Sequence, residues 1–307
     1  DSMLFQGDGE PLLYNKFFDM VRYARSKDIE VIFFTNGLLL NKDIAQESVA
    51  LGVSQIFCSL PAGTDKTYCL VTHHQDLTAL SKVLDNLKYL TSVKRQSNKI
   101  YPKLMMTHVI HTLNYQEIMQ MAQNDVEVGA DVMRFYLIRL DDNNKFLQLK
   151  PKGIKSIRES MLKVKAYLKD KHVELLDTTD FQLDHYEKDT GAWSKGVFLK
   201  EGCPLGWFFS LVPALGDLSL CCHLRTVGYL KEKSFKEIWT SQEYEKYRVQ
   251  AKYLKDNQDV TFLNGVKLYD QHCEHCDTHQ VIRDIWEELK NYNLERFVFS
   301  QRVELKG

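Results

Sequence analysis

The chain has 307 residues, 44% of them hydrophobic and 26% charged, and its 40 Lys and Arg nearly balance its 41 Asp and Glu. This length allows one large α/β domain or two smaller domains. The balanced charge gives no electrostatic case for binding nucleic acid or an anionic membrane, and no run of 18 apolar residues suits a membrane span. No signal peptide is visible, so we expect a cytoplasmic protein.

The first half of the sequence predicts strands that alternate with helices. Five short apolar runs are typical of parallel strands buried on both faces, and apolar residues recur at helical spacing between them. This alternation predicts right-handed crossovers and a parallel α/β sheet or barrel. The predicted strands cover residues 3–5, 31–34, 55–60, 104–110 and 132–138.

Polar and glycine-rich residues follow these strands, at the end where parallel folds bind ligands. Taken singly, each has a purely structural explanation: a tight turn, a satisfied core histidine, or a salt bridge at a strand end. Their ordered series favours a binding rim. The series comprises Gly7-Asp8-Gly9-Glu10-Pro11, Thr35-Asn36-Gly37, Ser59, His108, Arg134 and Arg139.

Three of these stretches, FQGDGEPLL, VIFFTNGLLL and QIFCSLPAGTDKTY, resemble the radical S-adenosylmethionine (radical SAM) superfamily. The resemblance implies a partial (β/α)6 TIM-like barrel whose strands 2–6 lie in residues 1–172. It also implies that the glycine-rich motif binds the amino group of SAM. Glycines let the backbone approach the ammonium group, and the acidic side chain accepts a hydrogen bond from it. The implied SAM-binding residues are Gly7, Asp8, Gly9, Glu10, Pro11, Thr35, Asn36 and Ser59, with Asp8 in place of the first glycine of the usual pair.

The sequence departs from the superfamily pattern in one large respect. The Cys-x3-Cys-x2-Cys motif that holds the superfamily's first [4Fe-4S] cluster is missing. We therefore expect the first βα unit and its cysteine loop to precede Asp1 in a longer parent protein, and this chain alone to be inactive in radical generation. The alternative is a natural relative that has lost that cluster.

Most of the cysteines lie in the second half, in a pattern typical of metal ligands rather than disulfides. Cys203-x12-Gly-x4-Cys221 is followed by Cys273-x2-Cys276. Gly216 permits a hairpin that brings Cys203 and Cys221 together, and a capping box at 234–237 predicts a helix between the two pairs. Four thiolates can hold either a cubane iron–sulfur cluster or a zinc ion.

The cysteine pattern resembles the auxiliary cluster domain of radical SAM enzymes, called SPASM in its long form and twitch in its short form. The resemblance implies a small α+β domain over residues 201–290, after a linker at 173–200 and before a tail at 291–307. It implies one auxiliary [4Fe-4S] cluster, as in the twitch form, because no cysteine follows Cys276. The implied ligands are Cys203, Cys221, Cys273 and Cys276.

The remaining cysteines and the histidines near the Cys-x2-Cys pair are expected to have other roles. Cys222 cannot easily point at the same metal as Cys221, so we expect it to be buried or beside the site. Cys58 and Cys69 are interpreted as core thiols. His272 and His275 are interpreted as surface residues.

The resemblance further implies an enzyme. The parent protein would cleave SAM reductively with an electron donor such as flavodoxin or ferredoxin, and the 5′-deoxyadenosyl radical would abstract hydrogen from the substrate. The auxiliary cluster would conduct electrons and favour oxidation of a small alcohol, a sugar or a peptide side chain. Candidate pocket residues are His108, Arg134 and Arg139. The alternative is a non-catalytic module, stabilised by zinc or an iron–sulfur cluster, that binds a peptide or protein partner.

Overall fold

The computed structural model describes residues 1–7, 9–276, 278, 282, 284, 287, 288, 291 and 292. The chain forms two compact units, Asp1–Asp184 and His185–Gly307. Among the described residues, no helix combines the length and the apolar character needed to cross a membrane.

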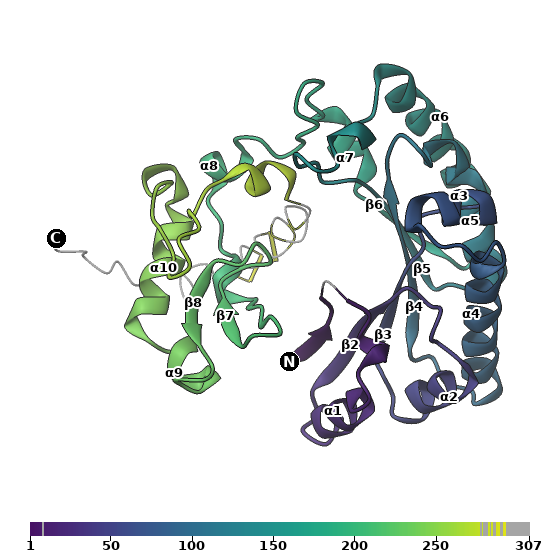
Figure 1. Ribbon diagram of the computed structural model, residues 1–307, viewed down its shortest axis with the longest axis horizontal. Helices are drawn as coiled ribbons and strands as arrows, with labels where there is room; N and C mark the ends of the chain where they lie inside the picture. Colours follow the sequence, from purple (N-terminus) through teal and green to yellow (C-terminus); the bar gives the residue numbers. More distant parts are fainter. Residues whose placement is uncertain are drawn as a thin grey trace. The chain divides into compact units, whose positions relative to one another are not determined.

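The first unit is built on a six-stranded sheet whose strands follow one another in chain order. All five neighbouring pairs are parallel, which requires a crossover between each strand and the next. The predicted α/β fold class is confirmed by this sheet (Figure 1). The strands are β1 Ser2–Phe5, β2 Glu30–Thr35, β3 Gln55–Ser59, β4 Lys103–Ile110, β5 Val132–Leu137 and β6 Glu174–Asp177.

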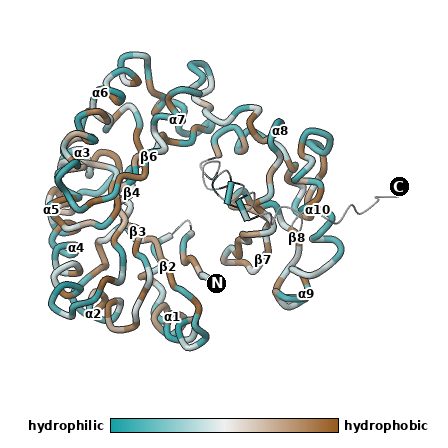
Figure 2. The backbone as a smooth tube through the Cα atoms, turned by 180° about the vertical axis from the view of Figure 1, so that it is seen from behind, coloured by the Kyte–Doolittle hydropathy of each residue, from teal (hydrophilic) through white to brown (hydrophobic). Residues whose placement is uncertain are grey.

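Helices run along one side of this curved sheet, as Figure 1 shows for α4, α5 and α6. Figure 2 shows that the strands they cover are the more hydrophobic part of the unit. The helices are α1 Phe17–Arg25, α2 Lys42–Ala50, α3 Asp65–Thr72, α4 Ala79–Gln96, α5 Ile118–Val128, α6 Pro151–Leu168 and α7 Thr179–Asp184. Short 3-10 helices at Pro11–Leu13, Tyr115–Glu117 and Lys145–Leu147 lie in the loops.

The two faces of the sheet differ in their environment. On the face that the helices cover, Phe33 packs edge-on against Phe17 of α1 with ring centroids 5.2 Å apart. Because side chains alternate along a strand, the residues next to Phe33 point to the opposite face, here called the inner face. On the inner face the rings of Phe34 and Phe57 stack 4.5 Å apart. The inner face also carries Ser59 at the end of β3 and Arg134 on β5.

Residues 173–200, predicted as a linker, are divided between the two units. The first part forms β6, which pairs with β5, and then α7, so it belongs to the first unit. The second part belongs to the second unit, where Trp193 is 1% exposed. The sequence Glu-Leu-Leu-Asp of β6 contains no apolar run of the usual length. As an edge strand, β6 is stabilised mainly by backbone hydrogen bonds to β5 and less by buried side chains.

The second unit contains a two-stranded antiparallel sheet and short helices, which is the expected small α+β domain. Gly216 adopts φ 83° in the turn that leads into β7, and the bridge between Leu211 and Ser219 confirms the predicted hairpin. Ser234 and Glu237 form the predicted capping box. The elements are α8 Val197–Glu201, β7 Asp217–Ser219, β8 Thr226–Tyr229, α9 Phe235–Trp239 and α10 Gln242–Lys252, with 3-10 helices at Leu205–Trp207, Leu254–Asp256 and Gln271–His275.

The unit begins at His185 rather than at the predicted residue 201. The predicted tail at 291–307 lies outside the described residues apart from its first two positions.

Candidate cofactor sites

The glycine-rich motif lies directly after β1, at the carboxyl edge of the sheet. Asp8 lies outside the described residues. A Cβ atom added to Gly7 or to Gly9 would meet no other atom within 4 Å, so the backbone here is open to an approaching ligand. Pro11 begins the short helix that follows, and Glu10 caps that helix by accepting from the N–H of Leu12 at 3.2 Å.

Glu10 also joins the first two loops of the rim. Its Oε2 accepts a hydrogen bond from the backbone N–H of Asn36 at 2.7 Å. The Asn36 side chain is exposed and accepts from the N–H of Leu38, while the buried Thr35 hydroxyl accepts from the N–H of Gly37. Most of the predicted SAM-binding residues therefore lie in two adjacent loops that the Glu10 carboxylate holds together.

The third loop of the rim is held by a residue that sequence reasoning missed. Glu117 accepts from the N–H groups of Gly63 and Thr64 at 2.8 and 3.1 Å, and from the hydroxyl of Thr67 at 2.6 Å. Ser59 lies half-buried at the start of this loop, on the inner face. The capping position of Glu117 before α5 carries no motif in the sequence, so only its contacts reveal its role.

His108, a candidate pocket residue, lies in the core under the helices. It is 0% exposed, Nε2 lies 2.7 Å from Oδ2 of Asp125 on α5, and Nδ1 lies 2.6 Å from the carbonyl oxygen of Leu60. Its ring stacks on Phe135. Both ring nitrogens of His108 therefore have hydrogen-bond partners in the core, on the face of the sheet opposite the inner face. This arrangement matches the alternative of a satisfied core histidine.

The two candidate arginines lie in different places. Arg134 is on the inner face, with its guanidinium 4.9 Å from the ring centroid of Tyr136. Among the described residues, its buried Nε has no hydrogen-bond partner. Arg139 is exposed beyond the end of β5, where its carbonyl oxygen accepts from Asn144 at 3.0 Å. Arg134 therefore faces the same surface as Ser59, whereas Arg139 lies in the rim loop.

In the second unit, four cysteines from three segments line one cavity: Cys203, Cys221, Cys273 and Cys276. The cavity has a volume of about 30 Å³, more than the ~10–15 Å³ that a single water needs. Burial raises the pKa of the Cys203 thiol to about 12. Among the described residues, no three His, Cys, Asp or Glu side chains converge on one position as ligands of a single ion.

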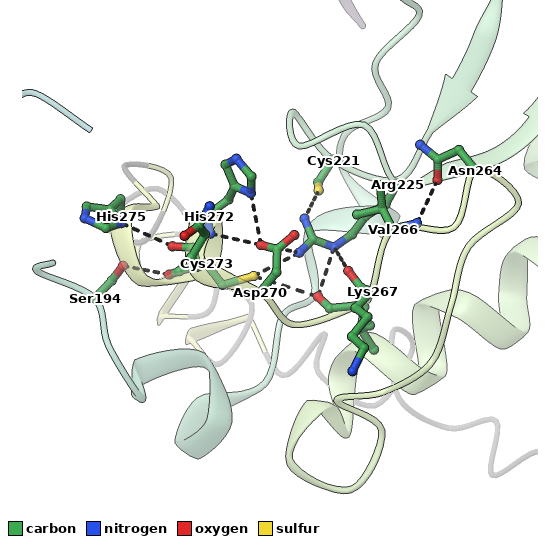
Figure 3. A network of polar contacts seen from close by, with 12 residues as sticks. Ser194, Cys221, Arg225, Asn264, Val266, Lys267, Asp270, His272, Cys273 and His275 are labelled. Atoms are coloured by element: carbon green, nitrogen blue, oxygen red, sulfur yellow. Dashed lines mark hydrogen bonds and ion pairs between the residues drawn. The ribbon is translucent and has the colours of Figure 1, made fainter. Parts of the chain in front are cut away.

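A buried arginine stands between two of these thiols, as Figure 3 shows. Arg225 is 2% exposed and donates from Nη1 to Sγ of Cys221 at 3.3 Å and from Nη2 to Sγ of Cys273 at 3.2 Å. An arginine is always charged, and a buried charge needs an opposite charge close by. Burial raises the pKa of the Cys273 thiol, and the Arg225 charge acts against this effect, since it favours the thiolate. The thiolate is the state in which cysteines bind iron or zinc.

The Cys273-x2-Cys276 pair is anchored by the segment that begins the second unit. The Ser194 hydroxyl donates to the carbonyl oxygen of Cys273 at 2.8 Å and accepts from the N–H of Cys276 at 3.0 Å. The N–H groups of Trp193 and Ser194 both donate to the carbonyl oxygen of Glu274.

The histidines and remaining cysteines around the site lie as follows. His275 is buried against the Trp193 ring, contrary to the expected surface position, whereas His272 is exposed as expected. Cys222 is half-buried and also lines the cavity. In the first unit, Cys58 is buried as expected of a core thiol, and Cys69 is only half-buried.

Comparison with protein families accounts for both sites. The family model described as the radical SAM superfamily matches residues 2–124, which include the rim loops after β1, β2 and β3. The model of the SPASM iron–sulfur cluster-binding domain matches residues 203–277, which include all four cysteines of the cavity. The chain contains a radical SAM domain followed by a SPASM domain.

Individual relatives agree with this assignment. An AdoMet-dependent heme synthase from Methanosarcina barkeri is 22% identical over 89% of this chain and 76% of its own length. Streptococcus suis SuiB bound to S-adenosylmethionine superposes with a TM-score of 0.57 at 16% identity, covering 80% of this chain. Native anSMEcpe with bound AdoMet and a peptide superposes with a TM-score of 0.53 at 14% identity, covering 98% of this chain and 86% of its own.

These similarities confirm the predicted fold class, a radical SAM barrel followed by a SPASM domain. The chain spans only 56% of the SuiB chain. The radical SAM and SPASM domains imply SAM and iron–sulfur clusters as cofactors.

Proposed function

We propose that this protein is a radical SAM enzyme that oxidises a small alcohol, a sugar or a peptide side chain with the help of one auxiliary [4Fe-4S] cluster. The observation that carries the proposal is the shared cavity of Cys203, Cys221, Cys273 and Cys276 in the SPASM domain. When bound, SAM and its cluster supply hydrogen abstraction, and the auxiliary cluster supplies a path for electrons.

In the radical SAM domain, the proposed SAM site is the rim after β1 and β2. The open backbone at Gly7 and Gly9 lets the ammonium of SAM reach carbonyl oxygens, and Glu10 adds a negative charge beside them. Thr35 and Asn36 shape the adjoining turn, and Ser59 lies at the end of the next strand. In this proposal Asp8 and Pro11 belong to the same motif.

Arg134 is the proposed contact for substrate on the inner face. The residue is half-buried on the inner face, and its guanidinium lies 4.9 Å from the centroid of the Tyr136 ring. In this proposal the planar, charged guanidinium binds a carboxylate or hydroxyl group of a substrate. Arg139, in the exposed loop beyond β5, is a second contact for a larger substrate such as a peptide. Among the relatives, anSMEcpe is described with a bound peptide and the M. barkeri protein as a heme synthase, so both substrate sizes have precedent.

The proposed partners are the substrate and an electron donor such as a flavodoxin or ferredoxin, in the cytoplasm. The competing hypothesis is a non-catalytic module in which the four cysteines hold a structural zinc ion. The buried Arg225 between two thiols favours neither metal by itself, because both need thiolates. Metal content therefore decides between the two hypotheses.

The first test is iron, sulfide and zinc analysis of this chain purified without oxygen, beside Cys203→Ala. We expect about four irons and four sulfides per chain, lost in the variant. Cys69→Ala is the matched control, since Cys69 lies in the other unit, where its thiol lies 3.2 Å from the carbonyl oxygen of Asp76. About one zinc without sulfide would contradict the proposal and support the structural site.

A second test addresses the assignment of Arg134 to substrate, by equilibrium binding of SAM to the wild-type chain and to Arg134→Gln. We expect SAM affinity to be unchanged in Arg134→Gln, because Arg134 is assigned to substrate. A large loss of SAM affinity in this variant would move Arg134 to the SAM site.

A further inference from the structure

Arg225 makes an unusual set of contacts around the SPASM cavity. Its two terminal nitrogens donate to sulfur atoms of two different predicted cluster ligands, Cys221 and Cys273, at 3.3 and 3.2 Å. These cysteines are far apart in the sequence and are brought to the same guanidinium by the fold (Figure 3). The arginine side chain therefore lies against the cluster position rather than at the surface of the unit.

The remaining donors of Arg225 are fixed by the backbone and by one carboxylate. Nε donates to the carbonyl oxygens of Lys267 and Leu268 at 3.0 and 2.9 Å. Nη2 also lies 3.1 Å from Oδ1 of Asp270, whose side chain caps the 3-10 helix that carries Cys273. A planar group held through all three nitrogens has little freedom to turn away from the sulfurs.

The turn that carries Cys221 also sets the position of Arg225. The N–H of Leu220 donates to the carbonyl oxygen of Arg225 at 2.9 Å, which closes the turn between β7 and β8. Leu224 adopts φ 53° within it, a conformation that is uncommon for a residue other than glycine. The side chain of Asn264 donates to the carbonyl oxygen of Leu224 and stabilises this conformation.

We propose that Arg225 raises the reduction potential of the SPASM-domain cluster, by holding a buried positive charge and two N–H donors against its thiolate ligands. The inference rests on the proposed function, because it requires an iron–sulfur cluster at this site. Reduction adds an electron to a cluster that its thiolates already make negative. A fixed cation and N–H···S hydrogen bonds stabilise the reduced state more than the oxidised state, and thereby raise the potential. Asp270 has the opposite charge at a similar place and partly offsets the effect.

The test is an anaerobic redox titration of the cluster in the full chain. The electron paramagnetic resonance signal of the reduced state monitors the titration. In Arg225→Gln we expect a more negative potential. At the wild-type midpoint, the ratio of reduced to oxidised cluster should fall about tenfold, which for one electron is about 59 mV. Arg225→Lys keeps the charge and should retain most of the wild-type potential. Asp270→Asn should shift the potential in the positive direction.

Arg248→Gln is the matched control for structural damage. Arg248 is also buried in this unit, but it donates to the carbonyl oxygen of Gly206 and to Glu245 instead of to a cysteine. We expect its cluster potential to match the wild type. If Arg225→Gln does not retain iron and sulfide, the shifts in Arg225→Lys and Asp270→Asn decide the question.

The outcomes separate this inference from the proposed function. A wild-type chain that holds no iron and sulfide contradicts both. If the wild-type chain holds a cluster and its potential is the same in Arg225→Gln, only the role of Arg225 is overturned. If Arg225→Gln loses its cluster, an unchanged potential in Asp270→Asn has the same meaning.

Discussion

The backbone N–H of Asn36 donates to Oε2 of Glu10 over 2.7 Å, and this bond links the loops that follow β1 and β2. Oε1 of the same carboxylate accepts from the N–H of Leu12 at 3.2 Å. Each carboxylate oxygen has a second lone pair, so Glu10 can hold the loops together and still accept from an ammonium group. The acid of the glycine-rich motif thus has a structural role in addition to its proposed contact with SAM.

Substitutions of Glu10 should separate these two roles. Glu10→Gln keeps an amide oxygen as acceptor but loses the charge, so we expect SAM affinity to fall about tenfold with a smaller loss of stability. Glu10→Ala removes both acceptors and should also lower the free energy of unfolding by about 1–3 kcal/mol. SAM titration and urea unfolding of each variant measure the two effects. Equal losses of stability in the two variants would contradict the structural role.

Gly37 in the second rim loop should tolerate no side chain. It adopts φ 80°, and a Cβ there would lie 2.7 Å from Cγ1 of Val83 and 3.2 Å from Sγ of Cys58. We expect Gly37→Ala to lose about 1–2 kcal/mol through the left-handed conformation and about 1–3 kcal/mol more through overpacking.

Gly216→Ala is the matched control for this prediction. Gly216 has nearly the same conformation, φ 83°, but nothing lies within 4 Å of an added Cβ. Gly216→Ala should therefore lose only the stability that the left-handed backbone conformation costs an alanine. Thermal unfolding of both variants compares them, and a Gly37→Ala protein no less stable than Gly216→Ala would show that the loop relaxes around the new methyl group.

The sequence predicted five of the six parallel strands, because each carries an apolar run. The sheet buries most of this run in β2–β5, whereas Met3 and Leu4 of β1 are exposed. The prediction missed β6, whose four residues alternate between half-buried and exposed positions at the edge of the sheet. Hydrophobic patterning reports burial, and β6 is held by pairing with β5 instead. The missed strand explains why the first part of the predicted linker belongs to the first unit; the second part packs in the second unit, where Trp193 is buried.

The cysteines of the SPASM cavity could be predicted because their spacing is itself a pattern. Arg225, Ser194 and Glu117 could not, since each acts through contacts with residues distant in sequence. Arg225 reaches Cys273 across 48 positions, and Ser194 reaches Cys276 across 82. His108 shows the converse case, a polar residue at a suggestive position whose partner, Asp125, lies on a helix that no motif marks.

Ser194 should stabilise the cluster through the Cys273-x2-Cys276 pair. Its hydroxyl is the shared partner of the Cys273 carbonyl and the Cys276 N–H, and the residue is fully buried. Ser194→Ala leaves both backbone groups without this partner, at a loss of about 1–3 kcal/mol. We therefore expect iron release to a chelator to be about tenfold faster, followed by loss of the cluster absorbance.

Ser210→Ala is the control for Ser194→Ala. The Ser210 hydroxyl donates to the carbonyl oxygen of Ser219 in the same unit, instead of to the backbone of the Cys-x2-Cys pair. Its rate of iron release should equal that of the wild type. Equal rates in both variants would mean that the serine at position 194 has no specific effect on the cluster.

Removal of one partner from the buried pair of His108 and Asp125 should strongly destabilise the radical SAM domain. Both side chains are fully buried, and Nε2 lies 2.7 Å from Oδ2. Asp125→Asn leaves a buried imidazole without its carboxylate and should destabilise the domain by about 3–5 kcal/mol. Replacing both residues, as His108→Phe with Asp125→Leu, should destabilise the domain less than Asp125→Asn alone. Denaturant unfolding of the wild type, Asp125→Asn and the double variant measures this difference.

The same pair should make stability depend on pH in a defined direction. Burial alone would lower the pKa of His108, but the Asp125 carboxylate and the hydrogen bonds to Asp125 and Leu60 outweigh it and raise the pKa above its usual value. The unfolded pKa is about 6.5. A group whose pKa is raised by folding contributes its full stabilisation below the unfolded pKa and loses it as the pH rises through the folded pKa. The difference in unfolding free energy between the wild type and the His108→Phe, Asp125→Leu variant should therefore be largest below about pH 6.5 and shrink at higher pH. A difference that grows with pH would show that His108 is held neutral in the core.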